Sequence, residues 1–174
     1  SPLFDRQLSG PKLAVRAHWA LPADENPTAP LWENHFIMSF VDKVQAALEQ
    51  EERVYLTHVN TPRQVVIGGD PAACGRVISS LKSSSLKAPF DFTLHCAAMR
   101  SAYPALVDLL SWPLANLPAA RLYTAAGFAP LPLDRRGIAE KISTMLCSPL
   151  DFPALVRQVH ADGARVFIEL GANA

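Results

Sequence analysis

The sequence has no excess of charge of either sign. Its 174 residues include 16 lysines and arginines and 16 aspartates and glutamates, and this balance argues against a nucleic-acid-binding surface, which normally carries a basic excess. No apolar run approaches the roughly 20 residues that cross a bilayer. The 3 cysteines lack CxxC spacing, which argues against a disulfide framework or a structural zinc site. We therefore expect a soluble, cytoplasmic globular protein that binds no nucleic acid, no membrane and no metal.

Common motifs for a nucleophile or a phosphate site are also missing. The chain contains no G-x-S-x-G nucleophile elbow, no P-loop and no G-x-G-x-x-G fingerprint. Gly68-Gly69-Asp70 follows a predicted strand, but it lacks the rest of a phosphate-binding fingerprint. These motifs therefore suggest no function for the chain.

Proline positions and apolar periodicity divide the chain into parts. Three prolines lie within residues 21–31, which we expect to be a linker because proline disfavours both helix and strand interiors. The periodicity that follows predicts a β-α-β-β-α-β unit over residues 33–94, the ferredoxin-like arrangement, with its last strand at Pro89–Leu94. Its expected core residues are Phe36, Ile37, Val54, Leu56, Val66, Ile67, Val77, Ile78, Leu81 and Phe92.

The residues after this unit follow an α/β pattern. Predicted helices cover residues 97–110, 138–146 and 152–160, and predicted strands cover residues 121–126 and 165–170. Two strands cannot build a doubly covered parallel sheet, so we expect the rest of that sheet to lie outside this chain. The predicted fold class is α/β with an α+β small lobe, divided into residues 1–32, 33–94 and 95–174.

Of the histidines, His95 has the context of a catalytic base. It stands between a predicted strand and a predicted helix, in the string LHCAAM, where flanking elements hold the backbone while the side chain is accessible. We interpret His35 and His58, in predicted strands, as hydrogen-bonded interior or edge histidines. His18 and His160 are expected to be solvated on helices.

Three segments resemble one enzyme family in their order and spacing. VNTPRQVVIGG at 59–69 resembles the family segment NSP…QVVIAG, HCAAM at 95–99 resembles the catalytic-histidine motif HCALM, and IELG at 168–171 resembles the closing EVGP strand, with Ala172 in place of proline. These motifs belong to the acyltransferase domains of fatty-acid and polyketide synthases, the malonyl-CoA:acyl-carrier-protein transacylase family. SPLF, LSGPKLAVR, VYLT and FIELGA further resemble the acyltransferases of polyunsaturated fatty acid and heterocyst glycolipid synthases.

The resemblance implies a fold and a reaction. The fold is part of a large, α/β-hydrolase-like acyltransferase subdomain with an inserted ferredoxin-like subdomain. The reaction is ping-pong transfer of an acyl or malonyl group from CoA, through a serine, to the phosphopantetheine thiol of an acyl carrier protein. No cofactor is bound, and the partners are the carrier protein and other synthase domains. The nucleophilic serine is expected upstream of Ser1, so the chain is expected to be a truncated piece, or a separately encoded part, of a larger acyltransferase.

The resemblance also assigns roles to individual residues. His95 takes the serine proton and later returns it. In the family a backbone carbonyl orients the histidine ring, and Asp151 falls at the matching position, although a helix N-cap is the alternative for this residue. Asn60 is expected to line the substrate cleft or to serve as a turn residue. Leu94, a bulky residue before the histidine, is typical of malonyl selectivity, and Cys96 is interpreted as a packed small hydrophobe.

A second functional hypothesis stays open. The ferredoxin-like lobe can instead belong to a non-catalytic module that docks a carrier protein or a neighbouring synthase domain. A nucleophile elbow in the sequence upstream of this chain would favour the enzyme.

Overall fold

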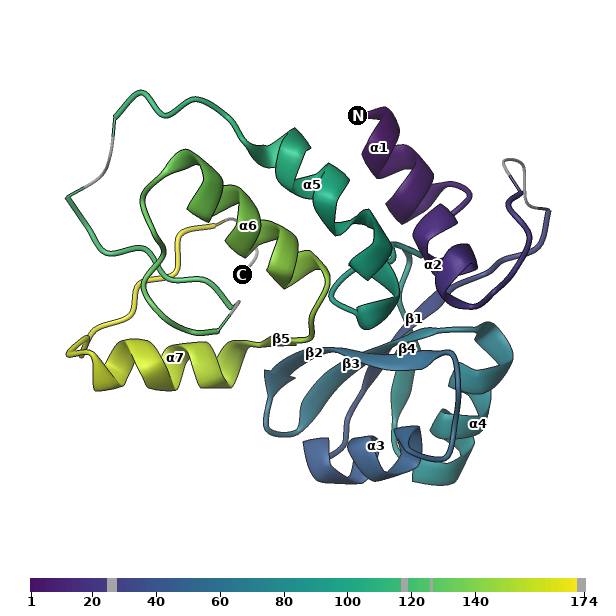
Figure 1. The fold of residues 1–174 in the computed structure, drawn as a ribbon. Coiled ribbons are helices and arrows are strands. Elements are labelled where there is room, and N and C mark those ends of the chain that lie inside the picture. Colours follow the sequence, from purple (N-terminus) through teal and green to yellow (C-terminus); the bar gives the residue numbers. More distant parts are fainter. Residues whose placement is uncertain (25–27, 117–118, 126, 172–174) are drawn as a thin grey trace.

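The computed structural model describes residues 1–24, 28–116, 119–125 and 127–171. The small lobe contains, in chain order, β1 (Glu33–Ile37), α3 (Val41–Leu48), β2 (Val54–Thr61), β3 (Gln64–Gly69), α4 (Pro71–Leu81) and β4 (Ser85–Lys87). The helical lobe contains α1 (Pro2–Phe4), the π-helix η1 (Asp5–Ser9), α2 (Leu13–His18), the 3-10 helix η2 (Ala97–Ala102), α5 (Tyr103–Leu110) and α6 (Arg135–Leu146). The last elements are β5 (Leu150–Asp151) and α7 (Phe152–Ala161). Figure 1 shows the helical lobe above the sheet of the small lobe.

The sheet of the small lobe has the strand order β4-β1-β3-β2, with β5 added beside β2. The four strands of the small lobe pair antiparallel, whereas β5 pairs with β2 in parallel. The central strand β3 is buried from Val65 to Gly69 because it has strands on both sides and a helical layer over one face. The observed element order matches the β-α-β-β-α-β unit predicted from the sequence.

The helices α3 and α4 cover the sheet face turned away from the helical lobe (Figure 1). Val44 and Val77 on these helices pack with Ile67 of β3 in the core of the small lobe. The start of α4 is fixed by Asp70, whose Oδ1 accepts a hydrogen bond from Ala73 N at 2.9 Å, and by Pro71 in the first turn. These two residues set the N-terminal end of α4.

An aromatic stack connects the two lobes. The rings of Trp19 and Trp32 stack at 5.9 Å between centroids, and those of Trp32 and Tyr55 stack at 5.8 Å. Trp19 Nε1 also donates a hydrogen bond to Tyr55 Oη at 2.8 Å. Trp32 precedes β1 and Tyr55 lies on β2, so the sheet is held against the core of the helical lobe.

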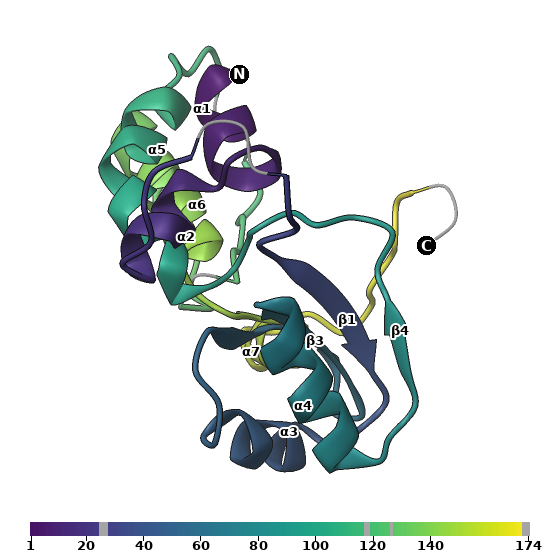
Figure 2. The same cartoon turned by 90° about the vertical axis from the view of Figure 1, so that its right-hand side faces the viewer.

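The strand predicted at Pro89–Leu94 is wrong. The edge strand is the shorter β4, and Ala88 N still donates to Asn34 O at 2.8 Å. Pro89 has no N–H to continue this pairing, and the chain then runs from β4 towards the helical lobe (Figure 2). There Thr93 N donates to Leu8 O at 3.1 Å, so helical-lobe contacts replace strand pairing.

Half of the ten predicted core residues are buried, four are half-buried and one is exposed. Ile37, Val54, Val66, Ile67 and Val77 are all at most 6% exposed, and Phe36, Leu56, Ile78 and Leu81 are half-buried. Phe92 is 46% exposed. It fails as a core residue because it lies on the connection between the lobes rather than on a strand.

The two strands predicted near the C-terminus are also wrong over their described residues. Within 121–125, Tyr123 forms a single bridge with Pro130. Residues 165–170 have no regular structure, and Val166 and Ile168 are each 78% exposed. An apolar sequence of strand type becomes a strand only where a neighbouring strand offers its N–H and C=O groups. Over the described residues, 121–125 pairs only around the Tyr123–Pro130 bridge, and 165–170 has no strand beside it.

Candidate active site

His95 is held where the two lobes meet by consecutive carbonyls at the end of α6. Its backbone N donates to Leu146 O at 2.9 Å, and its ring Nδ1 lies 2.7 Å from Met145 O. A carbonyl oxygen only accepts, so Nδ1 carries the ring hydrogen and Nε2 has the free lone pair of a neutral imidazole. His95 also has a φ of 57°, a left-handed backbone conformation that is uncommon for residues other than glycine. The arrangement fixes both the tautomer and the direction of the ring.

The surroundings of His95 favour its neutral form. The residue is 7% exposed. Burial lowers the pKa of the imidazole below its ordinary value, while the hydrogen bond to the Met145 carbonyl acts in the opposite direction. The imidazole is therefore mainly neutral at neutral pH, the form that accepts a proton.

Asp151 does not have the role predicted for it. Its Oδ1 accepts a hydrogen bond from Ala154 N at 2.8 Å, which makes it the N-cap of α7. Its position on β5 pairs with Val59 of β2. The carbonyl that orients the His95 ring belongs to Met145, which precedes Asp151 in the chain. The alternative interpretation, a helix cap, is therefore the one observed.

Asn60 and Leu94 are both half-buried near the lobe junction. Asn60 lies on β2, and its Nδ2 donates to Gln64 Oε1 at 3.3 Å across the turn to β3. Leu94 directly precedes His95. A groove of about 580 Å³ between the lobes is lined by other residues, Gln45, Leu48, Glu49, Val54, Tyr55, Leu56, Cys96, Ala97 and Pro149. Neither predicted substrate-binding residue lines this groove.

The sequence did not identify His58 as a neighbour of His95. The two ring centroids are 4.6 Å apart with planes at 75°, an edge-to-face contact. Its Nδ1 lies 3.0 Å from Thr57 Oγ1, so the predicted hydrogen-bonded histidine is also correct. Burial, and next the charge of His95, lower the pKa of His58 to about 4. No sequence signal reveals this pair, because β2 and the loop that carries His95 belong to different parts of the chain.

The cysteines are inert packing residues. Cys96 is 1% exposed, and burial raises the pKa of its thiol to about 12. The pKa values of the Cys74 and Cys147 thiols are likewise raised, to about 12 and about 11, chiefly by burial. The thiolate is the nucleophilic form, so Cys96 is the packed small hydrophobe predicted from the sequence.

The described part of the chain offers neither a metal centre nor a membrane span. Residues 1–24, 28–116, 119–125 and 127–171 contain no group of three or more His, Cys, Asp or Glu side chains placed to hold a metal ion. No helix in the same ranges has the length and apolar character of a membrane span.

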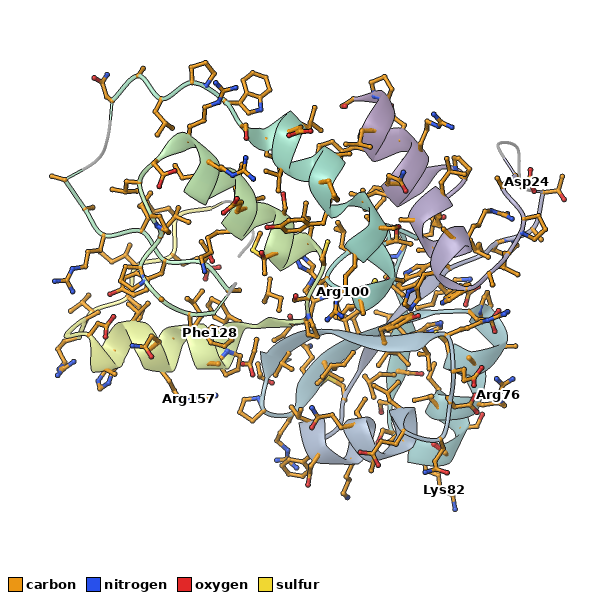
Figure 3. The ribbon with its side chains drawn as sticks, in the orientation of Figure 1. Asp24, Arg76, Lys82, Arg100, Phe128 and Arg157 are labelled. Carbon is orange, nitrogen blue, oxygen red and sulfur yellow. The ribbon has the colours of Figure 1, made fainter. Side chains whose placement is uncertain are left out.

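Arg100, labelled in Figure 3, is an exposed cation on η2, close in the chain to His95.

Two curated proteins resemble the chain in sequence. It is 23% identical over 172 residues to a polyunsaturated fatty acid synthase polypeptide of Thraustochytrium sp., a match that covers 92% of this chain and 8% of that protein. It is 27% identical over 118 residues to the spectinabilin polyketide synthase system protein NorA of Streptomyces orinoci, covering 66% of this chain and 6% of that protein. The chain thus spans less than a tenth of the length of either relative. No family model matches it.

Several solved structures with the same fold are acyltransferases. Acyl-carrier-protein S-malonyltransferase of Burkholderia pseudomallei has a TM-score of 0.69 and 19% identity, and the match covers 87% of this chain and 49% of that one. A malonyl-transacylase in complex with its type II polyketide synthase acyl-carrier protein has a TM-score of 0.69 and 18% identity, with coverage of 87% and 49%. The acyltransferase domain of module 8 of the salinomycin polyketide synthase has a TM-score of 0.64 and 18% identity, with coverage of 78% and 33%. The chain therefore has the fold of part of a malonyl-CoA:acyl-carrier-protein transacylase-like acyltransferase domain.

Proposed function

We propose that this chain supplies the general base of an acyltransferase that moves an acyl or malonyl group from CoA to the phosphopantetheine thiol of an acyl carrier protein. One observation carries the proposal: the ring of His95 is fixed by the Met145 carbonyl so that Nε2 is free to accept a proton. The nucleophile in this proposal is a serine outside the chain, because no serine here stands in a nucleophile elbow. CoA and phosphopantetheine act as substrates, and no cofactor takes part.

In the first half-reaction, His95 Nε2 removes the proton of the serine hydroxyl as the serine oxygen attacks the thioester carbonyl. The carbon–sulfur bond breaks, the serine keeps the acyl group, and CoA leaves as a thiol with the proton from Nε2. In the second half-reaction, Nε2 takes the proton of the phosphopantetheine thiol as its sulfur attacks the acyl-serine ester. The serine oxygen leaves and takes that proton back. Met145 O accepts from Nδ1 throughout and stabilises the transient imidazolium.

The lowered pKa of His95 suits both directions of proton transfer. A neutral imidazole is available to accept a proton, and a destabilised imidazolium gives that proton up readily to the leaving group. Asn60 and Leu94 remain candidates for contact with the acyl group: Asn60 follows His58 closely on β2, and Leu94 adjoins His95. In this proposal the bulk of Leu94 favours malonyl over larger branched groups.

The direct test of the function is kinetic and uses a longer protein in which this chain is joined to the residues that carry the proposed serine. His95→Ala should slow serine acylation by malonyl-CoA by on the order of 10²–10⁴-fold, the usual contribution of a positioned base. His160→Ala, at an exposed position on α7, is the matched control and should leave the rate unchanged. Near-normal acylation in His95→Ala would contradict the proposal.

A different observation favours the second candidate function, a carrier-protein docking module. Arg63 lies over the ring of Phe40, with its guanidinium carbon 4.6 Å from the centroid, and Lys43 Nζ lies 6.0 Å from the same centroid. Phe40 is 43% exposed. Two cations beside an exposed ring suit a partner with phosphate or carboxylate groups.

Titration calorimetry of the 174-residue chain with a holo acyl carrier protein tests this second candidate. Loss of both cations in Lys43→Ala/Arg63→Ala should weaken binding by about tenfold or more. Arg76→Ala on α4, labelled in Figure 3, is the control and should bind as the original chain does. The docking module would be favoured over the enzyme by two results together: the chain binds the carrier protein, and His95→Ala leaves the acylation rate of the longer protein unchanged.

A further inference from the structure

His58 and His95 come from different lobes and meet ring to ring. His58 lies on β2 and is half-buried, whereas His95 lies on the loop before η2 and is 7% exposed. Their centroids are 4.6 Å apart and the ring planes are at 75°. The side of His95 that β2 approaches is therefore covered by a second imidazole rather than by an aliphatic side chain.

Hydrogen-bond accounting fixes the tautomer of His58. Thr57 Oγ1 donates to Val66 O at 3.1 Å, and Val66 O, a carbonyl oxygen, cannot donate in return. A hydroxyl has one hydrogen, so Thr57 Oγ1 must accept from His58 Nδ1, which is 3.0 Å away. Neutral His58 thus carries its hydrogen on Nδ1, as His95 does.

The contact makes double protonation of the pair costly. Two imidazolium rings at this separation would repel one another in a mostly dry environment. Burial first, and then the charge of His95, lower the pKa of His58 to about 4, so His58 is neutral at neutral pH. The other titratable side chains on the adjoining segments are Cys96, Arg100, Cys147 and Asp151, of which the two thiols are also neutral at neutral pH.

We propose that His58 is a positioning residue for the base: its ring packs against His95, excludes water from that imidazole and thereby holds it neutral, with Nε2 free to accept a proton. The inference rests on the proposed role of His95. It adds a second histidine, which never exchanges a proton with substrate, as the residue that sets the pH range in which His95 works.

Two variants of His58 separate the ring contact from the hydrogen bond to Thr57. His58→Asn retains a donor to Thr57 Oγ1 but loses the ring, whereas His58→Phe retains a ring and loses the donor. His35→Asn is the matched control, because His35 is also a strand histidine, bound to Glu33 Oε2 at 3.1 Å on β1. Thermal unfolding of all three variants establishes that each is folded.

Histidine-labelled samples of the full chain are titrated by NMR, following the ring nitrogens of His95. We expect His58→Asn to move the pKa of His95 upward, towards its ordinary value of 6.5, by on the order of half a pH unit or more. His58→Phe and His35→Asn should leave it where it is in the original chain. An unchanged pKa of His95 in His58→Asn, or an equal rise of that pKa in His58→Phe, would overturn the inference.

A kinetic measurement on the longer protein distinguishes failure of the inference from failure of the function. In His58→Asn the acid limb of the kcat/KM profile for serine acylation should move to higher pH, while the plateau at alkaline pH stays within about threefold. A merely structural role would lower the plateau and leave the limb in place, which would also contradict the inference. Activity that survives His95→Ala would reject the proposed function itself, whatever the NMR titration shows.

Discussion

At the scale of single residues, the His95 ring lacks the contact predicted for it and makes two contacts that the sequence did not reveal. Asp151 was expected to orient His95, but the ring bonds to Met145 O and packs against His58. The contact with Met145 uses a backbone carbonyl, which every residue has, so no pattern of side chains in the sequence predicts it. The second depends on how the two lobes pack. His95 itself was recognisable because its neighbours in the chain match a family motif.

The buried histidines should make stability depend on pH. The pKa of His58 is about 4 in the folded chain, lowered chiefly by burial, against 6.5 when the chain is unfolded. The contribution of neutral His58 to the free energy of unfolding is therefore fully present above pH 6.5. It is lost as the pH falls towards 4, because the unfolded chain takes up a proton that the folded chain does not. Since the side chain is only partly buried, we expect a loss on the order of 1–3 kcal/mol in the free energy of unfolding.

Urea unfolding at pH 7 and pH 4.5 measures this loss, with His58→Phe as the comparison. The variant should lose less stability over the same interval because it has no imidazole at that position. An equal loss in both chains would show that other groups cause the pH dependence.

At the scale of elements, Asp151 matters as the N-cap of α7 rather than as a residue that orients His95. Asp151→Ala should lower the free energy of unfolding by about 1 kcal/mol through loss of the α7 cap, and Asp151→Asn should restore most of it. Both variants of the longer protein should acylate their serine within about threefold of the original rate, because Met145 O orients His95. A rate loss of a hundredfold or more in the well-folded Asp151→Asn would reinstate Asp151 as an active-site residue.

The connection from β4 to His95 is a second element that can be tested. Thr93 is fully buried, and its Oγ1 donates to Gln7 O at 2.7 Å in the helical lobe. Thr93→Val keeps the shape and removes the donor, so the free energy of unfolding should fall by about 1–3 kcal/mol. Thr144→Val, which removes a bond to Glu140 O within α6, is the control and should cost less. Equal effects would mean that the Thr93 bond does not hold the connection in place.

Local periodicity predicted the elements whose partners are close in the chain. The helices at α3, α4, α6 and α7 and the strands β1 to β3 follow from apolar spacing, caps and prolines. The segments 121–126 and 165–170 have strand-like sequences, yet over the described residues they form no strand, because pairing depends on neighbours that sequence spacing does not supply. Pro89–Leu94 fails for a related reason: Phe90 O and Phe92 O accept from the Asn34 side chain and Thr93 bonds to the helical lobe, so tertiary contacts take the place of strand pairing.

At the scale of the whole molecule, the chain has the fold of part of an acyltransferase domain, holds the His95 ring on a backbone carbonyl, and has no G-x-S-x-G motif in its sequence. It covers 49% of the Burkholderia S-malonyltransferase and 8% of the Thraustochytrium polyunsaturated fatty acid synthase polypeptide. The exposed apolar residues Val166, Ile168 and Leu170 lie on the segment that resembles the family's closing strand. These features fit a proposal in which base and nucleophile lie on different parts of a larger protein.

Intact-mass analysis after incubation with malonyl-CoA tests most directly whether the base lies on this chain and the nucleophile lies outside it. Three samples are compared: the 174-residue chain alone, the longer protein that contains it, and the longer protein with His95→Ala. We predict one malonyl adduct on a serine upstream of Ser1 in the longer protein, formed on the order of 10²–10⁴ times more slowly in His95→Ala, and no adduct on the chain alone. A stable malonyl-serine adduct on the chain alone would contradict the account, because it would require a nucleophile among these residues.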